Sequence, residues 1–190
     1  MPAINMPHGA KKLTFVVAFS ALCLHADVKP LLFHLRGVPN FHQVNDGLYR
    51  GGQPSPAGFE SLAKLGVKTV VDLRIPDGQS SWEEKVVKSL GMHYVHIPLH
   101  SGETPIRQDV DKAFTILLDN AQWPVYVHCR EGKDRTGMII ACYRISHDGW
   151  TNRRALAEAK SYAFREISPA MENYIMQYHP STQQQPPPQH

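Results

Sequence analysis

Apolar residues along the chain form short continuous runs and, between them, stretches with helical spacing. The runs are rich in β-branched and aromatic residues and are typical of buried strands; they occupy Val67–Arg74, Met92–Ile97 and Val125–His128. One stretch between them carries Val110, Phe114, Leu117 and Leu118 at the spacing of a helix face. Strands that alternate with helices predict an α/β fold whose central, mostly parallel sheet is flanked by helices.

Capping residues and prolines predict where the helices begin. We expect helices after Ser55-Pro56, ended by Gly66, and after Ser80 or Ser81, running from Trp82 to Leu90. Upstream of them, an Asn45-Asp46-Gly47 turn predicts two short strands within residues 38–54. The remaining expected helices begin at Thr104-Pro105, after Thr151 and at Ser168-Pro169.

The most informative stretch follows the strand Val125–His128. Cys129 stands at the carboxyl end of this strand, a short polar loop with a central glycine comes next, and an apolar helix begins near Thr136-Gly137. Loop N–H groups and the positive end of a helix dipole form a site for anions. A thiol in such a site has a lowered pKa, and the resulting thiolate is a strong nucleophile. Arg135 can bind two phosphate oxygens through its planar guanidinium.

Cys129 and Arg135 are separated by five residues, with His128 before them and Thr136-Gly137 after them. This pattern resembles the phosphate loop of the cysteine-dependent tyrosine and dual-specificity phosphatases. The loop interior Gly132–Arg135 is similar to bacterial members and to some phosphoinositide phosphatases that carry Lys-Asp before the arginine. The segment Leu48–Pro54 resembles the opening of small dual-specificity-like domains, and the resemblance covers residues 38–179.

The resemblance implies a two-step reaction. Cys129 attacks phosphorus to give a phosphocysteine, which water then hydrolyses. Arg135 and the backbone amides of the loop hold the phosphoryl oxygens, and Thr136 hydrogen-bonds the thiolate. The expected substrate-binding residues are Arg130, Glu131, Gly132, Lys133, Asp134 and Arg135.

The sequence leaves the identity of the general acid open among several carboxylates. The family usually carries an aspartate in the loop that here spans His100–Thr104, and Glu103 is the only carboxylate there. Asp134 is the preferred candidate, because it resembles the proton donor proposed for some lipid-directed relatives. An ion pair that orders a loop arginine is the competing role for Asp134. Further alternatives are Asp77, Asp109 and the absence of a dedicated acid.

Three neighbouring side chains have expected supporting roles. We expect His128 to tune the Cys129 loop through a hydrogen bond rather than to act as a base. Lys133 is a candidate contact for a second phosphate group. Arg74 ends a strand at the same mouth, where it either adds positive charge or pairs with Asp77 on the surface.

These residues favour a phosphatase acting on protein phosphotyrosine, with or without phosphoserine and phosphothreonine. The alternatives are a phosphoinositide or inositol-phosphate phosphatase and a weakly active phosphate-binding module. The expected partners are therefore phosphorylated proteins or inositol phosphates, and the chemistry requires no cofactor. The net charge of +3 is mild and does not indicate nucleic acid as a partner.

The histidines and the other cysteines do not indicate a metal site. His93 and His96 would face opposite sides of a strand, so they cannot chelate one ion together with His100. The spacing of the three cysteines matches neither a zinc site nor a disulfide framework. Cys142 falls on the apolar helix after the loop, where we expect it to be a small buried hydrophobic residue.

The two ends of the chain differ from the domain between them. Lys11-Lys12 followed by the apolar stretch Leu13–Leu24 is typical of a signal peptide, with cleavage expected after Ala26. Residues 1–26 therefore predict a secreted or periplasmic protein without a stable membrane anchor; a first helix packed on the domain is the alternative. Residues 180–190 are rich in glutamine and proline and are expected to be a disordered tail.

Overall fold

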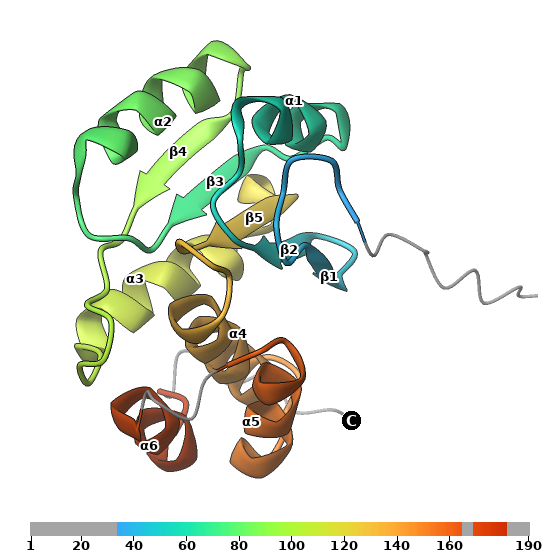
Figure 1. The fold of residues 1–190 in the computed structure, drawn as a ribbon. Coiled ribbons are helices and arrows are strands. Elements are labelled where there is room, and N and C mark those ends of the chain that lie inside the picture. The colour runs from blue at the N-terminus through green and yellow to red at the C-terminus, as the bar shows by residue number, and fades with distance from the viewer. Residues whose placement is uncertain (1–33, 165–168, 182–190) are drawn as a thin grey trace, which may run out of the picture. The chain divides into compact units, whose positions relative to one another are not determined.

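The computed structural model describes residues 34–164 and 169–181 of the chain (Figure 1). Within these residues five strands form one sheet in the order β1-β2-β5-β3-β4. Their bounds are β1 His42–Asn45, β2 Leu48–Gly51, β3 Thr69–Asp72, β4 His93–His96 and β5 Val125–His128. Only β1 and β2 pair antiparallel among these strands, so the predicted mostly parallel sheet is confirmed.

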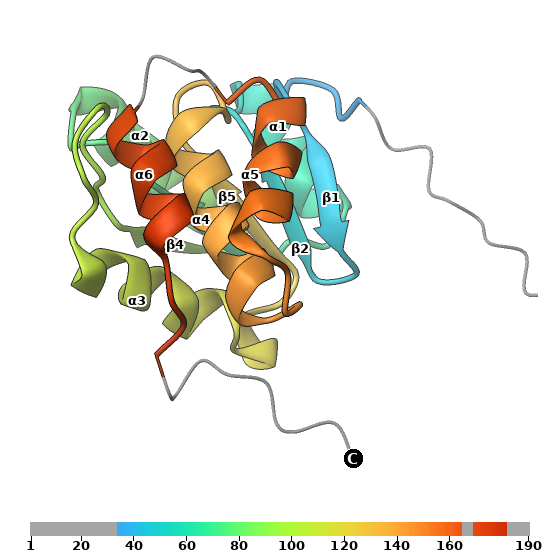
Figure 2. The same ribbon diagram turned by 90° about the horizontal axis from the view of Figure 1, so that it is seen from below.

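Helices cover both faces of this sheet. On one face lie α1 (Pro56–Lys64) and α2 (Gly78–Ser89), and on the other lie α3 to α6 (Figure 1). Figure 2 shows α4 in the middle of the second layer, with α5 and α6 beside it. The bounds of this layer are α3 Arg107–Leu117, α4 Asp134–Ser146, α5 Asn152–Ser161 and α6 Pro169–Gln177, and a short 3-10 helix, Asn120–Gln122, precedes β5.

Side chains along the central strands β3 and β5 point alternately to the two faces of the sheet, and each face has its own hydrophobic core. Val71 and Val127 pack in the core beneath α3 to α6. Their neighbours Val70 and Tyr126 pack in the core beneath α1 and α2. Successive strand residues point to opposite faces, so both cores are built from the same short valine-rich runs. Cys142 lies in the first core with no exposed surface, as its position on an apolar helix predicts.

The predicted starts are correct for some helices and wrong for others. Ser55 caps α1 and Thr151 caps α5, as expected. The helix expected after Ser80 or Ser81 begins at Gly78, because the Asp77 carboxylate accepts the Ser80 N–H and caps it earlier. The helix expected at Thr104-Pro105 begins at Arg107 instead, without a side-chain cap.

The parallel strands bring their carboxyl ends to one edge of the sheet. Asp72 of β3 lies opposite His128 of β5 and also opposite His96 of β4. The segments that follow these three strands therefore start side by side, which is where ligands bind in open parallel sheets.

The terminal predictions fall largely outside the described residues. The expected signal peptide, residues 1–26, lies outside them entirely, as do residues 182–190 of the expected tail and Ser168, the expected cap of α6. No helix of residues 34–164 and 169–181 is long and apolar enough to cross a membrane.

Candidate active site

The loop after β5 turns back tightly on β2. Gly132 has a φ of +71°, a conformation that favours glycine, and a Cβ at this position would lie 2.3 Å from the carbonyl carbon of Gly51. The next residues enter α4 directly, with Asp134 and Arg135 in its first turn. The sequence Gly132–Arg135 thus lets a short loop pass close to β2 and place a helix N-terminus behind Cys129.

Several groups hold the loop carbonyls on the side of β2. The Gln53 backbone N–H donates to the Arg130 carbonyl at 3.1 Å. The Gly132 carbonyl accepts from Arg50 Nη2 at 2.8 Å and from Asn40 Nδ2 at 3.0 Å. On the other side of the loop, backbone N–H groups of Glu131 and Thr136 hydrogen-bond the Cys129 sulfur. The loop therefore presents donors toward the thiol, as an anion site requires.

Cys129 is buried, with 3% of its surface exposed. Burial raises the pKa of its thiol, but a hydrogen bond from the Thr136 side chain, the Thr136 N–H, the charge of Arg135 and the Glu131 N–H together lower that pKa below its ordinary value. The Thr136 hydroxyl is itself buried and makes no other hydrogen bond within the described residues, so it is available to the sulfur. The local environment favours a thiolate.

Arg135 lies between the ends of two strand segments. Its Nη1 is 3.5 Å from the Leu73 carbonyl and 3.4 Å from the Leu99 carbonyl. Contacts of this length are weak hydrogen bonds, so the guanidinium can turn to a stronger acceptor such as a phosphate oxygen.

A cavity of about 220 Å³ opens at Cys129, and it is lined by Ser101, Cys129, Arg130, Glu131, Asp134 and Arg135. It therefore unites the nucleophile candidate Cys129, the cation Arg135 and the carboxylate Asp134. Asp134 has only 6% of its surface exposed, so most of its carboxylate is removed from bulk water.

The other carboxylates proposed as acids lie elsewhere. The Glu103 side chain is 70% exposed and lies 3.9 Å from His100, outside the residues that line the cavity. Asp77 caps α2, and Asp109 pairs with Lys112 at 2.7 Å. Among these candidates, the structure brings only Asp134 to the cavity.

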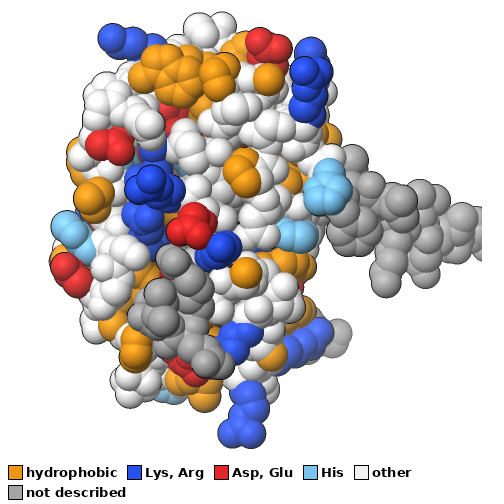
Figure 3. Space-filling view, viewed as in Figure 1, with side chains coloured by type: hydrophobic (Ala, Val, Ile, Leu, Met, Phe, Trp, Pro, Cys, Tyr) orange, Lys and Arg blue, Asp and Glu red, His pale blue; other side chains and the backbone are white. Residues whose placement is uncertain are grey.

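Charged side chains surround the outer rim of the loop. Lys133 Nζ pairs with Glu131 Oε2 at 2.9 Å, and both side chains are partly exposed. Figure 3 shows Lys and Arg side chains gathered together, with an acidic side chain beside them, on the face near the ends of β3 and β4. The rim can therefore meet an anionic substrate with side chains of both signs.

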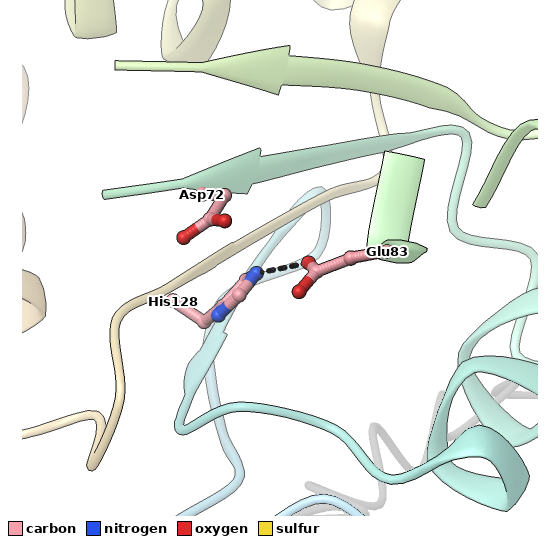
Figure 4. Close-up of side chains that lie close together, drawn as sticks. All are labelled: Asp72, Glu83 and His128. Carbon is pink, nitrogen blue, oxygen red and sulfur yellow. Dashed lines mark hydrogen bonds and ion pairs between the residues drawn. The ribbon is translucent and has the colours of Figure 1, made fainter. Parts of the chain in front are cut away.

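Beneath Cys129 lies a cluster that we call the strand-end network, made of Asp72, Arg74, Glu83 and His128. Arg74 binds Asp72 through Nη2 at 2.6 Å and Glu83 at 2.7 Å. Glu83 also accepts from His128 Nε2 at 2.7 Å (Figure 4). Arg74 thus points into the protein, and the predictions that it adds charge at the mouth or pairs with Asp77 on the surface are wrong.

His128 is held as a cation by its two contacts. Its Nδ1 lies 3.2 Å from the Cys129 carbonyl and its Nε2 lies 2.7 Å from a Glu83 carboxylate oxygen. The backbone carbonyl accepts, and so does the Glu83 carboxylate that Arg74 bonds, so these contacts favour a ring with a proton on each nitrogen. Burial lowers the pKa of His128, but the hydrogen bond and charge of Glu83 outweigh it and raise that pKa. The predicted hydrogen bond of His128 to the Cys129 loop is present.

Asp72, Glu83 and His128 also have the donor types of a metal site, and their ligand atoms lie within 4.8 Å of one another. However, the Arg74 guanidinium already bonds both carboxylates, and the His128 ring donates a hydrogen bond to Glu83. A metal ion would have to displace one cation and deprotonate the other. The cluster is a hydrogen-bonded ion network.

Two residues of this region were missed from the sequence. Glu83 falls within the expected helix Trp82–Leu90 without an expected role, although Ser80, Glu83 and Val87 recur at the spacing of one helix face and all are buried. Arg50 was read only as part of a family-like opening segment. Its burial follows from the packing of β2 in the folded protein, for which the sequence gives no signal.

Comparison with known proteins gives a consistent family. Residues 27–177 match the family model described as "DSP-PTPase phosphatase fused to NAD+ Kinase". Inositol diphosphatase DSP4 of Arabidopsis thaliana is 31% identical over 55% of this chain and 54% of its own length. Dual specificity protein phosphatase TpbA of Pseudomonas aeruginosa is 29% identical over 66% of this chain and 55% of its own length. The chain thus spans about half of each of these two relatives.

Solved structures agree with the fold. The catalytic core of the PP-IP phosphatase SIW14 from S. cerevisiae superposes with a TM-score of 0.69, at 24% identity over 77% of this chain and 89% of that one. TpbA superposes with a TM-score of 0.64, at 23% identity over 74% of this chain and 86% of the other. At these identities the structures establish a shared fold.

Proposed function

The chain belongs to the DSP-PTPase phosphatase family, and on that premise we propose that it hydrolyses phosphomonoesters through a phosphocysteine formed on Cys129. In the first step the Cys129 thiolate attacks phosphorus and the bond to the leaving oxygen breaks. Arg135 and the loop N–H groups hold the equatorial oxygens, where negative charge is spread in the transition state. Asp134 donates a proton to the leaving oxygen, so that an alcohol or phenol departs.

The second step reverses these roles. Water attacks the phosphocysteine, and the Asp134 carboxylate accepts one of its protons. The S–P bond breaks, inorganic phosphate leaves, and the electron pair returns to Cys129 as a thiolate. The Thr136 hydroxyl stabilises that thiolate by the same hydrogen bond that lowers the pKa of Cys129 in the free enzyme.

The observation that carries the proposal is the composition of the cavity at the loop. It brings together Cys129 as the nucleophile, Arg135 as a two-pronged ligand of phosphate oxygens and Asp134 as the proton donor. The position of Asp134 next to the nucleophile supports its role as the acid over that of the exposed Glu103.

The first proposed substrate class is protein phosphotyrosine, with or without phosphoserine and phosphothreonine. A relative from Dictyostelium discoideum named "Probable tyrosine-protein phosphatase DG1060" is 28% identical over 72% of this chain and 83% of its own length. TpbA is named a dual specificity protein phosphatase. Both names support this class.

Inositol phosphates are the second candidate, favoured by the cations of the rim. Arg130 lines the cavity and Lys133 lies beside it in the loop, so both can meet phosphate groups other than the one being transferred. The relative DSP4 is named an inositol diphosphatase. A polyphosphorylated ring would use these contacts more fully than a phosphotyrosine side chain.

The deciding experiment measures phosphate release from a phosphotyrosine peptide and from a panel of inositol phosphates and phosphoinositides. Cys129→Ser should abolish release, and Asp134→Asn should lower it by about 10²- to 10⁴-fold for a substrate with a poor leaving group. Glu103→Gln is the matched control and should remain close to wild type. Normal turnover by Asp134→Asn would remove the acid role, and no release from any substrate would indicate a phosphate-binding module.

We also propose that the protein is exported. Lys11-Lys12 and the apolar stretch Leu13–Leu24 support a signal peptide, and the family match begins at residue 27, immediately after the expected cleavage at Ala26. N-terminal sequencing of protein from the medium or periplasm should begin at Asp27. Retention of the full chain inside cells would contradict export.

A further inference from the structure

Arg50 lies behind the phosphate loop, on β2. Its surface is 1% exposed, and its Nη2 donates to the Gly132 carbonyl at 2.8 Å. Its guanidinium carbon lies 4.6 Å from the centre of the Tyr162 ring. The side chain is therefore buried between β2, the loop and the end of α5.

The hydrogen bonding of Arg50 is incomplete. Within the described residues, Nε and Nη1 are buried and have no hydrogen-bond partner. Glu158 is the acidic side chain whose charge acts most on Arg50, but it is already bonded by Arg144 through Nε and Nη2, at 2.8 to 3.2 Å. A buried, partly unsatisfied cation costs stability, so packing alone does not account for an arginine here.

Arg50 nevertheless stays charged. Burial lowers its pKa to about 10, and the opposing influences include the charge of Cys129. At neutral pH the protein therefore keeps a fixed positive charge within electrostatic reach of the nucleophile.

The contact to Gly132 also sets the direction of one loop amide. In a trans peptide the C=O and the following N–H point in opposite directions. Arg50 and Asn40 both hold the Gly132 carbonyl on the β2 side. The Lys133 N–H of the same peptide must then point away from β2, toward the concave side of the loop.

We propose that Arg50 is a positioning residue of the phosphate site. From behind the loop it fixes the Gly132 peptide and adds a positive charge that favours the Cys129 thiolate and a bound phosphate group. This role rests on the proposed phosphatase function, but its test uses measurements that need no turnover. Buried polar groups left unsatisfied are expected where function opposes stability.

The test compares Arg50→Met, which removes the charge, with Arg50→Lys, which keeps a charge but loses the planar guanidinium. The first readout is the pH midpoint of Cys129 alkylation by iodoacetamide, followed by mass spectrometry of the Cys129 peptide. The second is the affinity for inorganic phosphate, measured by calorimetry. Arg50→Met should raise the midpoint by about one pH unit and weaken phosphate binding about tenfold. Arg50→Lys should keep the midpoint and weaken phosphate binding severalfold.

Arg144→Met is the matched control, because Arg144 is also a largely buried arginine but pairs with Glu158 and Asp148, away from the loop. It should lower the urea midpoint of unfolding, and the size of that loss is the reference for a structural arginine. Arg50→Met should unfold at the same urea concentration as wild type or at a higher one.

Unchanged alkylation and phosphate binding in both Arg50 variants would overturn the proposal. So would a loss of stability in Arg50→Met as large as that in Arg144→Met, since that marks a structural arginine. An Arg50→Met protein that does not fold is the extreme of that loss and overturns the proposal as well. Failure of the phosphatase function is distinguishable, because it appears as absence of turnover in the wild-type protein whatever the Arg50 variants do.

Discussion

The two sets of buried charges next to Cys129 differ in how completely they are paired. In the strand-end network the Arg74 guanidinium and the His128 ring each bond a carboxylate, so two cations balance Asp72 and Glu83. On the β2 side, Arg50 makes one hydrogen bond to a backbone carbonyl, and its Nε and Nη1 have no hydrogen-bond partner among the residues that the structure describes. The paired set has the properties of a structural support, whereas the unpaired charge lies behind the loop that we propose binds an anion.

The contrast between the two sets indicates where the protein tolerates the energetic cost of burying a charge. A balanced network stabilises the fold only while every member is present, because loss of one member leaves an uncompensated buried charge. An unpaired cation behind an anion site gains its counter-charge when the thiolate forms or when a phosphate group binds. Changes to the first set should therefore appear in stability, and changes to the second in chemistry.

The largest expected effect is that of Glu83→Gln. Glutamine keeps the shape of the side chain but removes the charge between Arg74 and His128, so we expect a loss of about 3–5 kcal/mol in the free energy of unfolding. Urea denaturation followed by tryptophan fluorescence measures it.

Glu84→Gln is the neighbouring control, because Glu84 is exposed and pairs with Lys88 on the surface. It should unfold like the wild type. A Glu83→Gln protein as stable as Glu84→Gln would mean that the network does not support the fold.

The next effect is a dependence of stability on pH, measured with Cys129→Ser so that the thiolate does not contribute. The pKa of His128 is raised in the folded protein above its ordinary value of 6.5. Above pH 6.5 the unfolded chain loses this proton first, so the folded protein binds more protons and stability falls as pH rises, by up to about 1.4 kcal/mol per pH unit.

Urea unfolding between pH 6.5 and 8.5 measures this slope. Adding Glu83→Gln should flatten it, because the group that holds the His128 proton is gone. Stability that stays constant or increases over this range in Cys129→Ser would contradict a protonated His128. In the protein with Cys129 intact the slope should be smaller, since the lowered pKa of Cys129 adds stability as pH rises.

A smaller effect is expected for Tyr94→Phe. Tyr94 donates to Asp72 Oδ2 at 2.9 Å, at the edge of the strand-end network. Removing a hydrogen bond to a charged group should cost about 1.5–2 kcal/mol, whereas Tyr143→Phe, which loses a bond to the neutral Asn45 side chain, should cost about 1 kcal/mol. Equal losses would remove the distinction between charged and neutral partners at these positions.

The sequence predicted the parts of the site that are local in the chain. The strand, the loop and the helix N-terminus around Cys129 are consecutive, so their spacing alone indicated an anion site and a nucleophile. Alternating strands and helices likewise predicted the layers, because each element carries its own hydrophobic pattern. The helix bounds were less accurate where Asp77 rather than a serine provides the cap.

Long-range partners could not be predicted. Glu83 and His128 are 45 residues apart, and Arg50 and Gly132 are 82 residues apart. Their contacts depend on strand order, and the sequence alone left that order open. The same reason explains the error at Arg74: its two carboxylate partners meet only once β3 and α2 are packed together.

The smallest effect on stability is expected at the rim of the loop. Lys133→Ala removes a partly exposed ion pair with Glu131 and should change the free energy of unfolding by no more than about 0.5 kcal/mol. Its effect on catalysis should depend on the substrate, because only a substrate with a second phosphate group can use the Lys133 charge. We expect kcat/KM to fall about tenfold for inositol polyphosphates and less than about twofold for a phosphotyrosine peptide.

Lys112→Ala is the matched control, since Lys112 forms a similar exposed pair with Asp109 on α3. It should leave kcat/KM unchanged for both substrates. An equal fall in kcat/KM for both substrates in Lys133→Ala would show that Lys133 shapes the loop itself, in the manner proposed for Arg50. The rim would then not select substrates, and its role would not differ from that of the buried charge. A fall in kcat/KM for inositol polyphosphates alone would show that substrate selection lies on the outer side of the loop and support of the nucleophile on the side of β2.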